Sequence, residues 1–431
     1  MTAPVQYMGS DEQRSWRAGP RHIPFLTRVR IANYRSLRAV DVNLGPLTVL
    51  VGPNGVGKSN FIDSLAFLAE ALSVTPENAL GRRGGLSGLV TRVPARSGSL
   101  GIWVEARVPT GPLPEQLATA HYGFEVVFND QPGQRPFSIN REKCLLWWPD
   151  IGDAGSVLFE VKAGEVHVES KFMGTIGPIK TAPDRLYLPV ASADPTLAPL
   201  HNLLTNMAFY DPQLAALRSG EYTGGAVRLG PQGQELGTIL GTLAETYPKA
   251  KERLDEYLRA TVSGLEAVYR RFDRGSVTVE MRAHGGEGFT VTEMSDGTLR
   301  AAAVLTALFQ PWALEGRMPL IGIEEPELTV HPAAAGVLFD AMTEASSWVQ
   351  VVASSHSADL LDREDLPVNV VRAVSMEDGQ TVIGPVDEGS RKTLRDHLFT
   401  AGALMRTDQL VPSAESHRRS EVGNFDLFDT G

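Results

Sequence analysis

The chain has little of what would indicate a secreted or membrane-spanning protein. Its 431 residues include one cysteine, Cys144, so no internal disulfide can form, and we interpret this thiol as a small core side chain. No apolar run approaches the roughly 20 residues of a membrane span, and the polar N-terminus up to Pro20 has no signal-peptide core. These absences predict a cytoplasmic protein without a membrane partner.

Positive charge is in the minority, and long repeats are absent. The net charge of −11 excludes a protein that coats nucleic acid through an overall basic surface, although a local basic surface remains compatible with it. We find no internal repeat and no heptad pattern long enough for a coiled coil. The length therefore predicts two or three globular domains with an ordinary hydrophobic core.

A glycine-rich segment is the clearest motif that the chain does contain. It reads Gly52-Pro53-Asn54-Gly55-Val56-Gly57-Lys58-Ser59, which is the P-loop pattern G-x-x-x-x-G-K-S. A buried strand is predicted before it over 47–51, and a helix is predicted after it from Asn60 onward. This strand–turn–helix context is the one that the motif requires.

The chemistry expected of this segment is phosphate binding. The glycines let the backbone approach an anion, and the N–H groups from Asn54 to Asn60 point toward it at a helix N-terminus. Lys58 is predicted to reach the β- and γ-phosphates, and Ser59 to place its hydroxyl on Mg²⁺.

Two further strands are predicted to deliver acidic and basic side chains to the same sheet edge. The strand over 320–324 ends in Glu324-Glu325-Pro326-Glu327, and the next strand ends in Ser354-Ser355-His356. Ligands bind outside the carboxyl ends of strands in open α/β sheets. We expect Glu324 to hold Mg²⁺, Glu325 to deprotonate the attacking water, and His356 to sense the γ-phosphate.

A fourth candidate element is the segment Ser295-Asp296-Gly297-Thr298, which precedes a predicted helix. Ser295 is a good N-cap residue, and Gly297 is expected to leave the helix N-terminus open to an anion. An ordinary capped helix is the alternative interpretation of this segment.

Together these four elements resemble the ABC-type ATPase head. Glu-Glu-Pro-Glu followed by His331-Pro332, and the opening segment Ile31-Ala32-Asn33-Tyr34-Arg35-Ser36-Leu37, resemble the RecF, SMC and OLD branch rather than transporter ATPases. The resemblance covers about 25–72 and 290–375. It implies an α/β P-loop NTPase fold with ATP and Mg²⁺ as cofactors. It also implies a homodimer in which each ATP lies between the P-loop of one head and Ser295 and Gly297 of the other.

The resemblance also has departures. The segment 295–298, which corresponds to the signature of ABC-type heads, reads Ser-Asp-Gly-Thr rather than Ser-Gly-Gly. No Q-loop glutamine is assigned, since Gln116, Gln131 and Gln134 are equal candidates. No acidic cluster of an OLD-type nuclease follows His356, so a built-in nuclease is not expected. Arg35 is a candidate for a position near the nucleotide, and a surface arginine on a turn is an equally good interpretation of it.

The predicted organisation divides the chain into five parts. The head is split by an insertion whose β-rich first half is followed by helices, and that insertion is expected to determine specificity. In order, the parts are a disordered leader (1–24), the first part of the head (25–80), the β-then-helical insertion (81–290), the second part of the head (291–405) and a disordered acidic tail (406–431).

The sequence therefore predicts an ATPase that dimerises on ATP and acts in DNA repair or anti-phage defence. A regulatory ATPase that gates a separate effector, such as a nuclease or toxin, is the first alternative. A transporter subunit is disfavoured by the signature and the Glu-Glu pair, and a GTPase by the lack of an Asn-Lys-x-Asp motif. The sequence leaves open what the insertion binds, and its candidate contact residues are Arg82, Arg83, Trp147 and Trp148. It also leaves open whether DNA is a ligand and which protein any effector is.

Overall fold

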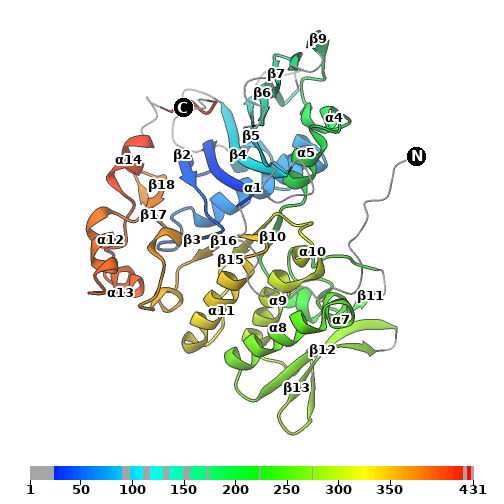
Figure 1. Ribbon diagram of the computed structural model, residues 1–431, viewed down its shortest axis with the longest axis vertical. Helices are drawn as coiled ribbons and strands as arrows, with labels where there is room; N and C mark the ends of the chain where they lie inside the picture. The colour runs from blue at the N-terminus through cyan, green and yellow to red at the C-terminus, as the bar shows by residue number, and fades with distance from the viewer. Residues whose placement is uncertain are drawn as a thin grey trace.

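The computed structural model describes residues 24–89, 98–109, 117–129, 135–148, 156–170, 174–222, 225–273, 275–420 and 425–428. A central sheet lies between a large antiparallel sheet on one side and a layer of helices on the other (Figure 1). Its strand order is β10-β15-β16-β3-β17-β18. The bounds of these strands are β10 Ala208–Tyr210, β15 Leu320–Glu324, β16 Gln350–Ser355, β3 Leu47–Val51, β17 Val371–Glu377 and β18 Gln380–Pro385.

The central sheet is parallel except for β18, and this arrangement brings the predicted motifs to one edge. β3 pairs with β16 on one side and with β17 on the other, and β16 pairs in turn with β15. All five residues of β3 are buried, as expected for a strand covered on both faces. The carboxyl ends of β3, β15 and β16 therefore lie side by side, and the segment that follows each one enters the same region.

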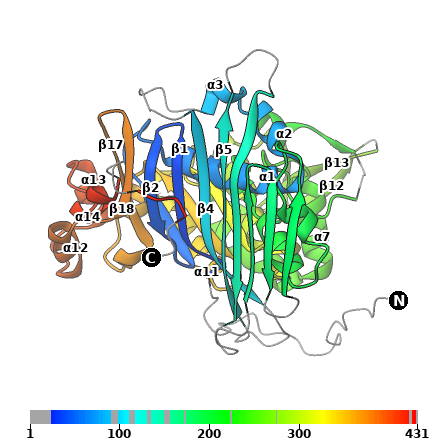
Figure 2. The same ribbon diagram turned by 90° about the horizontal axis from the view of Figure 1, so that it is seen from above.

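The large sheet has the order β2-β1-β4-β5-β6-β7-β8-β9 and is antiparallel throughout (Figure 2). Its strands are β1 Leu26–Tyr34, β2 Leu37–Asn43, β4 Ser99–Pro109, β5 Leu117–Phe128, β6 Phe137–Trp147, β7 Ser156–Lys162, β8 Glu165–Ser170 and β9 Gly174–Lys180. The boundary predicted at residue 81 is not a boundary in this sheet, because β4 pairs directly with β1. The β-rich half of the predicted insertion thus continues the sheet that the first two strands begin.

Two hydrophobic clusters hold the layers together. The first helix, α1 (Lys58–Ser73), contributes Phe61, Leu65 and Leu68 to a core shared with the large antiparallel sheet. On the other face of the central sheet, α9 (Asp296–Phe309) supplies a nearly continuous buried surface from Thr298 to Phe309. The remaining long helices of this second layer are α7 Leu236–Thr246, α8 Pro248–Thr261 and α11 Pro332–Ala345.

A small antiparallel sheet lies beyond these helices (Figure 1). Its strands are β11 Glu221–Tyr222, β12 Leu265–Asp273, β13 Ser276–Ala283 and β14 Gly288–Thr290. Short helices complete the chain: α2 Pro76–Gly81, α3 Leu86–Leu89, α4 Leu188–Ala191, α5 Ala198–Thr205, α6 Leu214–Arg218, α10 Pro311–Leu314, η2 Asp359–Leu361, η3 Val368–Val370, α12 Glu388–Arg395, α13 Ala401–Arg406 and α14 Ala414–Arg419. Within the described residues, no helix is both long enough and apolar enough to cross a membrane.

The predicted disordered tail is wrong for the residues that the structure describes. Helix α14 lies within it, and Leu427 and Phe428 are buried against Trp103 of β4. The charged composition of 406–431 concealed a short apolar segment whose partner is a tryptophan far away in the sequence. The predicted leader over 1–24 falls outside the described residues apart from Pro24.

Candidate nucleotide-binding site

The P-loop lies between β3 and α1, as the motif predicts. Gly57 has φ +105°, and a Cβ atom there would lie 2.1 Å from Oγ1 of Thr381, so this position requires glycine for both reasons. Oγ1 of Thr381 also donates a hydrogen bond of 2.8 Å to the carbonyl of Val56. Strand β18 therefore supports the loop from outside the motif, a role that no local pattern around Thr381 indicates.

Lys58 is buried against its own loop. Its Nζ donates to the carbonyl of Gly52 at 2.8 Å and to that of Pro53 at 2.7 Å. Burial lowers the pKa of Lys58, while the nearby carboxylates of Glu325 and Glu327 act to raise it. The loop thus holds an ammonium group among carbonyl oxygens, in a cradle of glycines and beside a helix N-terminus.

Glu324 and Ser59 are brought together. Glu324 ends β15 in register with Ser354 of β16, and the Ser59 hydroxyl is among the groups near its carboxylate. Burial raises the pKa of Glu324, and Glu325 and two aspartates contribute in the same direction. A half-buried carboxylate beside a hydroxyl offers the oxygen ligands that Mg²⁺ prefers, and a divalent cation would offset the repulsion among these acids.

Glu325 and His356 also face each other. Nδ1 of His356 lies 3.0 Å from Oε1 of Glu325, although the geometry is not that of a hydrogen bond. Glu325 has φ +44°, a region that side-chain-bearing residues seldom adopt, and its N–H donates to the carbonyl of Ser354 at 3.0 Å. The two predicted residues therefore meet beside the P-loop strand, across neighbouring strand ends.

Glu327 is a residue that the sequence interpretation did not single out. It is 6% exposed, and its Oε1 accepts a hydrogen bond of 2.5 Å from the hydroxyl of Ser355. That hydroxyl in turn accepts from the N–H of Ser357 at 3.0 Å, so Glu327 braces the segment that carries His356. Burial raises the pKa of Glu327. The sequence signal was its place in Glu-Glu-Pro-Glu, where Pro326 turns the chain back.

Ser295 caps α9 as expected, and Gly297 packs closely against a neighbouring loop. The Ser295 hydroxyl accepts from the N–H of Thr298 at 3.2 Å. A Cβ at Gly297 would lie 2.4 Å from the carbonyl of Thr329, so glycine here permits close packing against the loop after Glu327. The helix start is thus in direct contact with the segment that follows the acidic pair.

The turn between β1 and β2 reaches the start of α1. Arg35 donates to Oδ1 of Asn60 at 3.3 Å and pairs with Asp63 at 3.1 Å, while Asn60 donates to Ser36 at 2.7 Å. Asn60 therefore anchors the turn through its side chain, in addition to its predicted backbone role.

The candidates in the insertion have ordinary partners. Arg82 is paired with Glu70, and Arg83 with Glu70 and Asp63, so both arginines brace α1 from the loop after α2. Trp147 is exposed and Trp148 is partly buried in the sheet core. Cys144 is fully buried, as predicted, and burial raises its thiol pKa. The three Q-loop candidates lie outside the described residues.

Comparison with known families finds two ATPase domain models in this chain. Residues 25–88 match "AAA ATPase domain", and residues 234–362 match "AAA domain, putative AbiEii toxin, Type IV TA system". The first match contains the P-loop, and the second contains the signature segment, the acidic pair and His356.

Curated relatives are similar over short stretches. The DNA replication and repair protein RecF of Corynebacterium jeikeium is 41% identical over 63 residues, which is 14% of this chain and 15% of the relative. RecF of Paenarthrobacter aurescens is 44% identical over 10% of this chain and 12% of its own length. The OLD nuclease of Thermus scotoductus is 45% identical over 9% of this chain and 8% of its own length. The chain therefore aligns with less than a sixth of each relative.

Solved structures of SMC heads align with most of this chain at low similarity. An SMC head bound to the C-terminal winged-helix domain of ScpA has a TM-score of 0.47 at 15% identity, covering 85% of this chain and all of that one. The SMC head domain of Thermotoga maritima has a TM-score of 0.39 at 14% identity, covering 84% and 99%. These scores are too low to carry the assignment, which rests on the motifs, the sheet order and the sequence matches.

One α/β framework thus carries the P-loop, the acidic strand end, the histidine and the capped helix. Its two parts, on either side of the β-rich region, match ATPase domain models. The chain therefore contains two segments that match ATPase domain models, and it resembles the ABC-type ATPase head of RecF and OLD proteins.

Proposed function

We propose that this head binds ATP with Mg²⁺ and hydrolyses it. The observation that carries the proposal is the approach of His356 to Glu325, 3.0 Å apart at neighbouring strand ends beside the P-loop strand. Glu325 accepts the proton of the attacking water, and His356 orients that water against the terminal phosphate.

The remaining residues position the substrate. Lys58 exchanges its two carbonyl partners for phosphate oxygens, which compensate its charge more fully. Ser59 and Glu324 hold Mg²⁺, which supplies charge neutralisation on the phosphates when bound. The N–H groups from Asn54 to Asn60 complete the anion site.

We further propose that two heads close around ATP. The α9 start, with Ser295 and Gly297, contacts the nucleotide of the partner copy, as in the proteins that this head resembles. Its packing against Thr329 supports the proposal, because it links the signature to the loop after the acidic pair. Closure of the dimer at the start of α9 would therefore affect the position of Glu325 in the same head.

The biological setting that we propose is DNA repair or anti-phage defence, on the basis of the RecF and OLD relatives. The second candidate is a regulatory ATPase whose nucleotide state gates a separate effector. This role is suggested by the match of residues 234–362 to the AbiEii toxin family of a Type IV TA system. The two roles differ in whether duplex DNA changes the rate of ATP hydrolysis.

The experiment is to measure phosphate release by the full chain with Mg²⁺ and ATP, with and without duplex DNA. An ATPase acting on DNA is stimulated by the duplex, whereas an effector-gating ATPase is indifferent to DNA and co-purifies with its effector. No phosphate release above that of Lys58→Ala, with or without DNA, would refute the ATPase proposal itself.

A further inference from the structure

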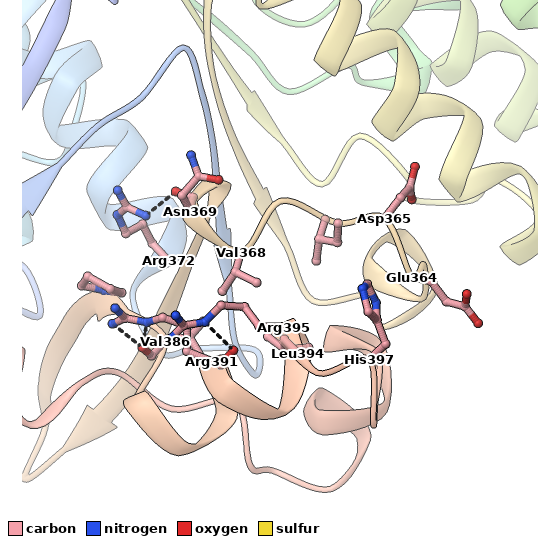
Figure 3. A pocket seen from close by; sticks show the side chains of 12 residues that line it. Glu364, Asp365, Val368, Asn369, Arg372, Val386, Arg391, Leu394, Arg395 and His397 are labelled. Carbon is pink, nitrogen blue, oxygen red and sulfur yellow. Dashed lines mark hydrogen bonds between the residues drawn. The ribbon is translucent and has the colours of Figure 1, made fainter.

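A concavity lies between the chain around η3 and β17 on one side and α12 on the other (Figure 3). Its volume of about 610 Å³ is within the range of small-molecule sites. Aliphatic side chains form much of its wall, and these are Leu366, Val368, Pro385, Val386 and Leu394. The rest of the lining is charged or polar, so the hollow combines an apolar surface with both positively and negatively charged side chains.

This hollow is distinct from the nucleotide site. Its lining comes from the chain that enters β17, the end of β18 and α12, whereas the P-loop follows the carboxyl end of the neighbouring β3. No lining residue belongs to the P-loop, to the acidic segment after β15 or to the histidine segment after β16. A ligand there would use none of the ATP contacts proposed above.

Arg372 forms one end of the hollow and is held entirely by carbonyl groups. Its Nε donates to Asn43 at 3.0 Å, and its Nη1 donates to Asn369 at 2.7 Å and to Val371 at 3.0 Å. Its Nη2 makes no hydrogen bond to the part of the chain that the structure describes. Arg391 lines the same hollow as Arg372. Burial and the positive charge of Arg391 both lower the pKa of Arg372.

Arg391 approaches the same end from α12. Its Nε and Nη2 donate to the carbonyl of Val386 at 3.3 and 3.0 Å, and its nearest carboxylate, the exposed Glu388, is 3.6 Å from Nη1. Other arginines of this acidic chain are forked onto carboxylates, as Arg363 is onto Asp365. Arg372 is held by carbonyls, and Arg391 by one carbonyl and the exposed Glu388, so the two guanidinium groups leave net positive charge on this wall.

Acidic side chains lie on the other side of the hollow. Glu364 and Asp365 are separated from Arg372 and Arg391 across the concavity (Figure 3). Asp365 is paired with Arg363, whereas Glu364 has no ion pair within the described residues. Glu364 would therefore repel a ligand with negative charge at both ends, whereas a ligand with one anionic end and an uncharged body fits both walls.

We propose that this hollow binds a small phosphorylated molecule, with its phosphate against Arg372 and Arg391 and its uncharged body along the aliphatic wall. Planar guanidinium forks match phosphate oxygens in geometry, and their free N–H groups supply the donors. The site would give the head a second ligand besides ATP.

Calorimetric titration of the full chain tests this proposal. All proteins carry Lys58→Ala, so that the P-loop does not bind the probes. The probes are monobutyl phosphate, inorganic phosphate, and 1,4-butanediol bisphosphate, which is charged at both ends. The test variants are Arg391→Gln and Arg372→Lys, and the matched control is Arg259→Gln, an exposed arginine of α8 in the opposite layer.

We expect monobutyl phosphate to bind more tightly than either other probe. Each test variant should weaken it about tenfold or more, the scale of one lost charge-assisted contact, and the control should leave it unchanged. Absence of binding at millimolar probe, or affinity that both test variants leave intact, would overturn the proposal. Because Arg391 is held only by the Val386 carbonyl and the exposed Glu388 among the residues that the structure describes, Arg391→Gln alone decides the matter if Arg372→Lys does not fold.

Discussion

The hydroxyl of Ser355 donates a hydrogen bond of 2.5 Å to Oε1 of Glu327, and this buried contact ties the end of β16 to the turn after β15. Replacing Glu327 with Ala removes the acceptor and leaves the hydroxyl buried without it. We expect the free energy of unfolding to fall by about 1–3 kcal/mol, measured by urea denaturation, and ATP turnover to fall because His356 follows Ser355 directly. Glu327→Gln keeps an acceptor oxygen and is the control. Equal losses in the two variants would contradict the bracing role.

A second buried carboxylate makes stability depend on pH. Glu142 of β6 accepts hydrogen bonds from Tyr122 and from the N–H groups of Tyr187 and Leu188, and burial raises its pKa to about 7. The folded state therefore holds a proton that the unfolded chain has already lost above pH 4.5. The stabilisation from this group is complete below about pH 4.5 and is lost as the pH rises through about 7.

The variant Glu142→Gln tests that pH dependence. It removes the titration, so the stability of wild type relative to the variant should fall by roughly 3 kcal/mol between those two pH values. Chemical denaturation of both proteins across this range measures the difference. A difference that is constant over this pH range would show that the pKa of Glu142 is not raised in the folded protein.

The C-terminal segment is expected to contribute to stability. Leu427 packs on Trp103 and lies so near Gly101 that a Cβ there would be 2.3 Å from it. Leu427→Ala should cost about 2 kcal/mol and change the fluorescence of Trp103. The control is Val411→Ala, a change at a side chain that is 42% exposed. Equal melting temperatures for Leu427→Ala and wild type would show that this segment does not contribute to stability.

Action of the signature across a dimer predicts complementation. Ser295→Arg adds bulk and charge at the start of α9, and Lys58→Ala removes the phosphate-binding cation, so each variant alone should lack turnover. A mixture forms dimers with one intact site and one doubly damaged site, and it should regain part of the hydrolysis. Phosphate release by the mixture, with heterodimers verified by mass spectrometry, measures this. Heterodimers without any recovered activity would argue against the shared site.

Much of the head could be predicted from the sequence because its signals are local. The P-loop, the buried strand before it and the acidic pair at the end of β15 each depend on a few adjacent residues whose types dictate backbone conformation. That Glu324 and Glu325 would meet the P-loop followed from one rule, the common edge of parallel strand ends.

The rest depends on contacts between distant segments. Thr381 supports the P-loop from a strand that the sequence interpretation did not identify, and Gly297 is required by a carbonyl from another loop. The pairing of β4 with β1, which joins the predicted insertion to the head, follows from no local pattern. Leu427 and Phe428 were hidden in the same way, because two apolar residues in a polar tail indicate no partner by themselves.

The most direct test of the account is the turnover and ATP binding of Glu325→Gln. The substitution keeps the size of the side chain and removes the proton acceptor beside His356, so hydrolysis should fall by roughly 10²-fold or more. ATP binding, measured by calorimetry with Mg²⁺, should persist because Lys58, Ser59 and Glu324 are unchanged, and the ATP-bound protein should appear as a dimer in light scattering. Turnover equal to that of wild type would contradict the assignment of Glu325 as the base and with it the central claim.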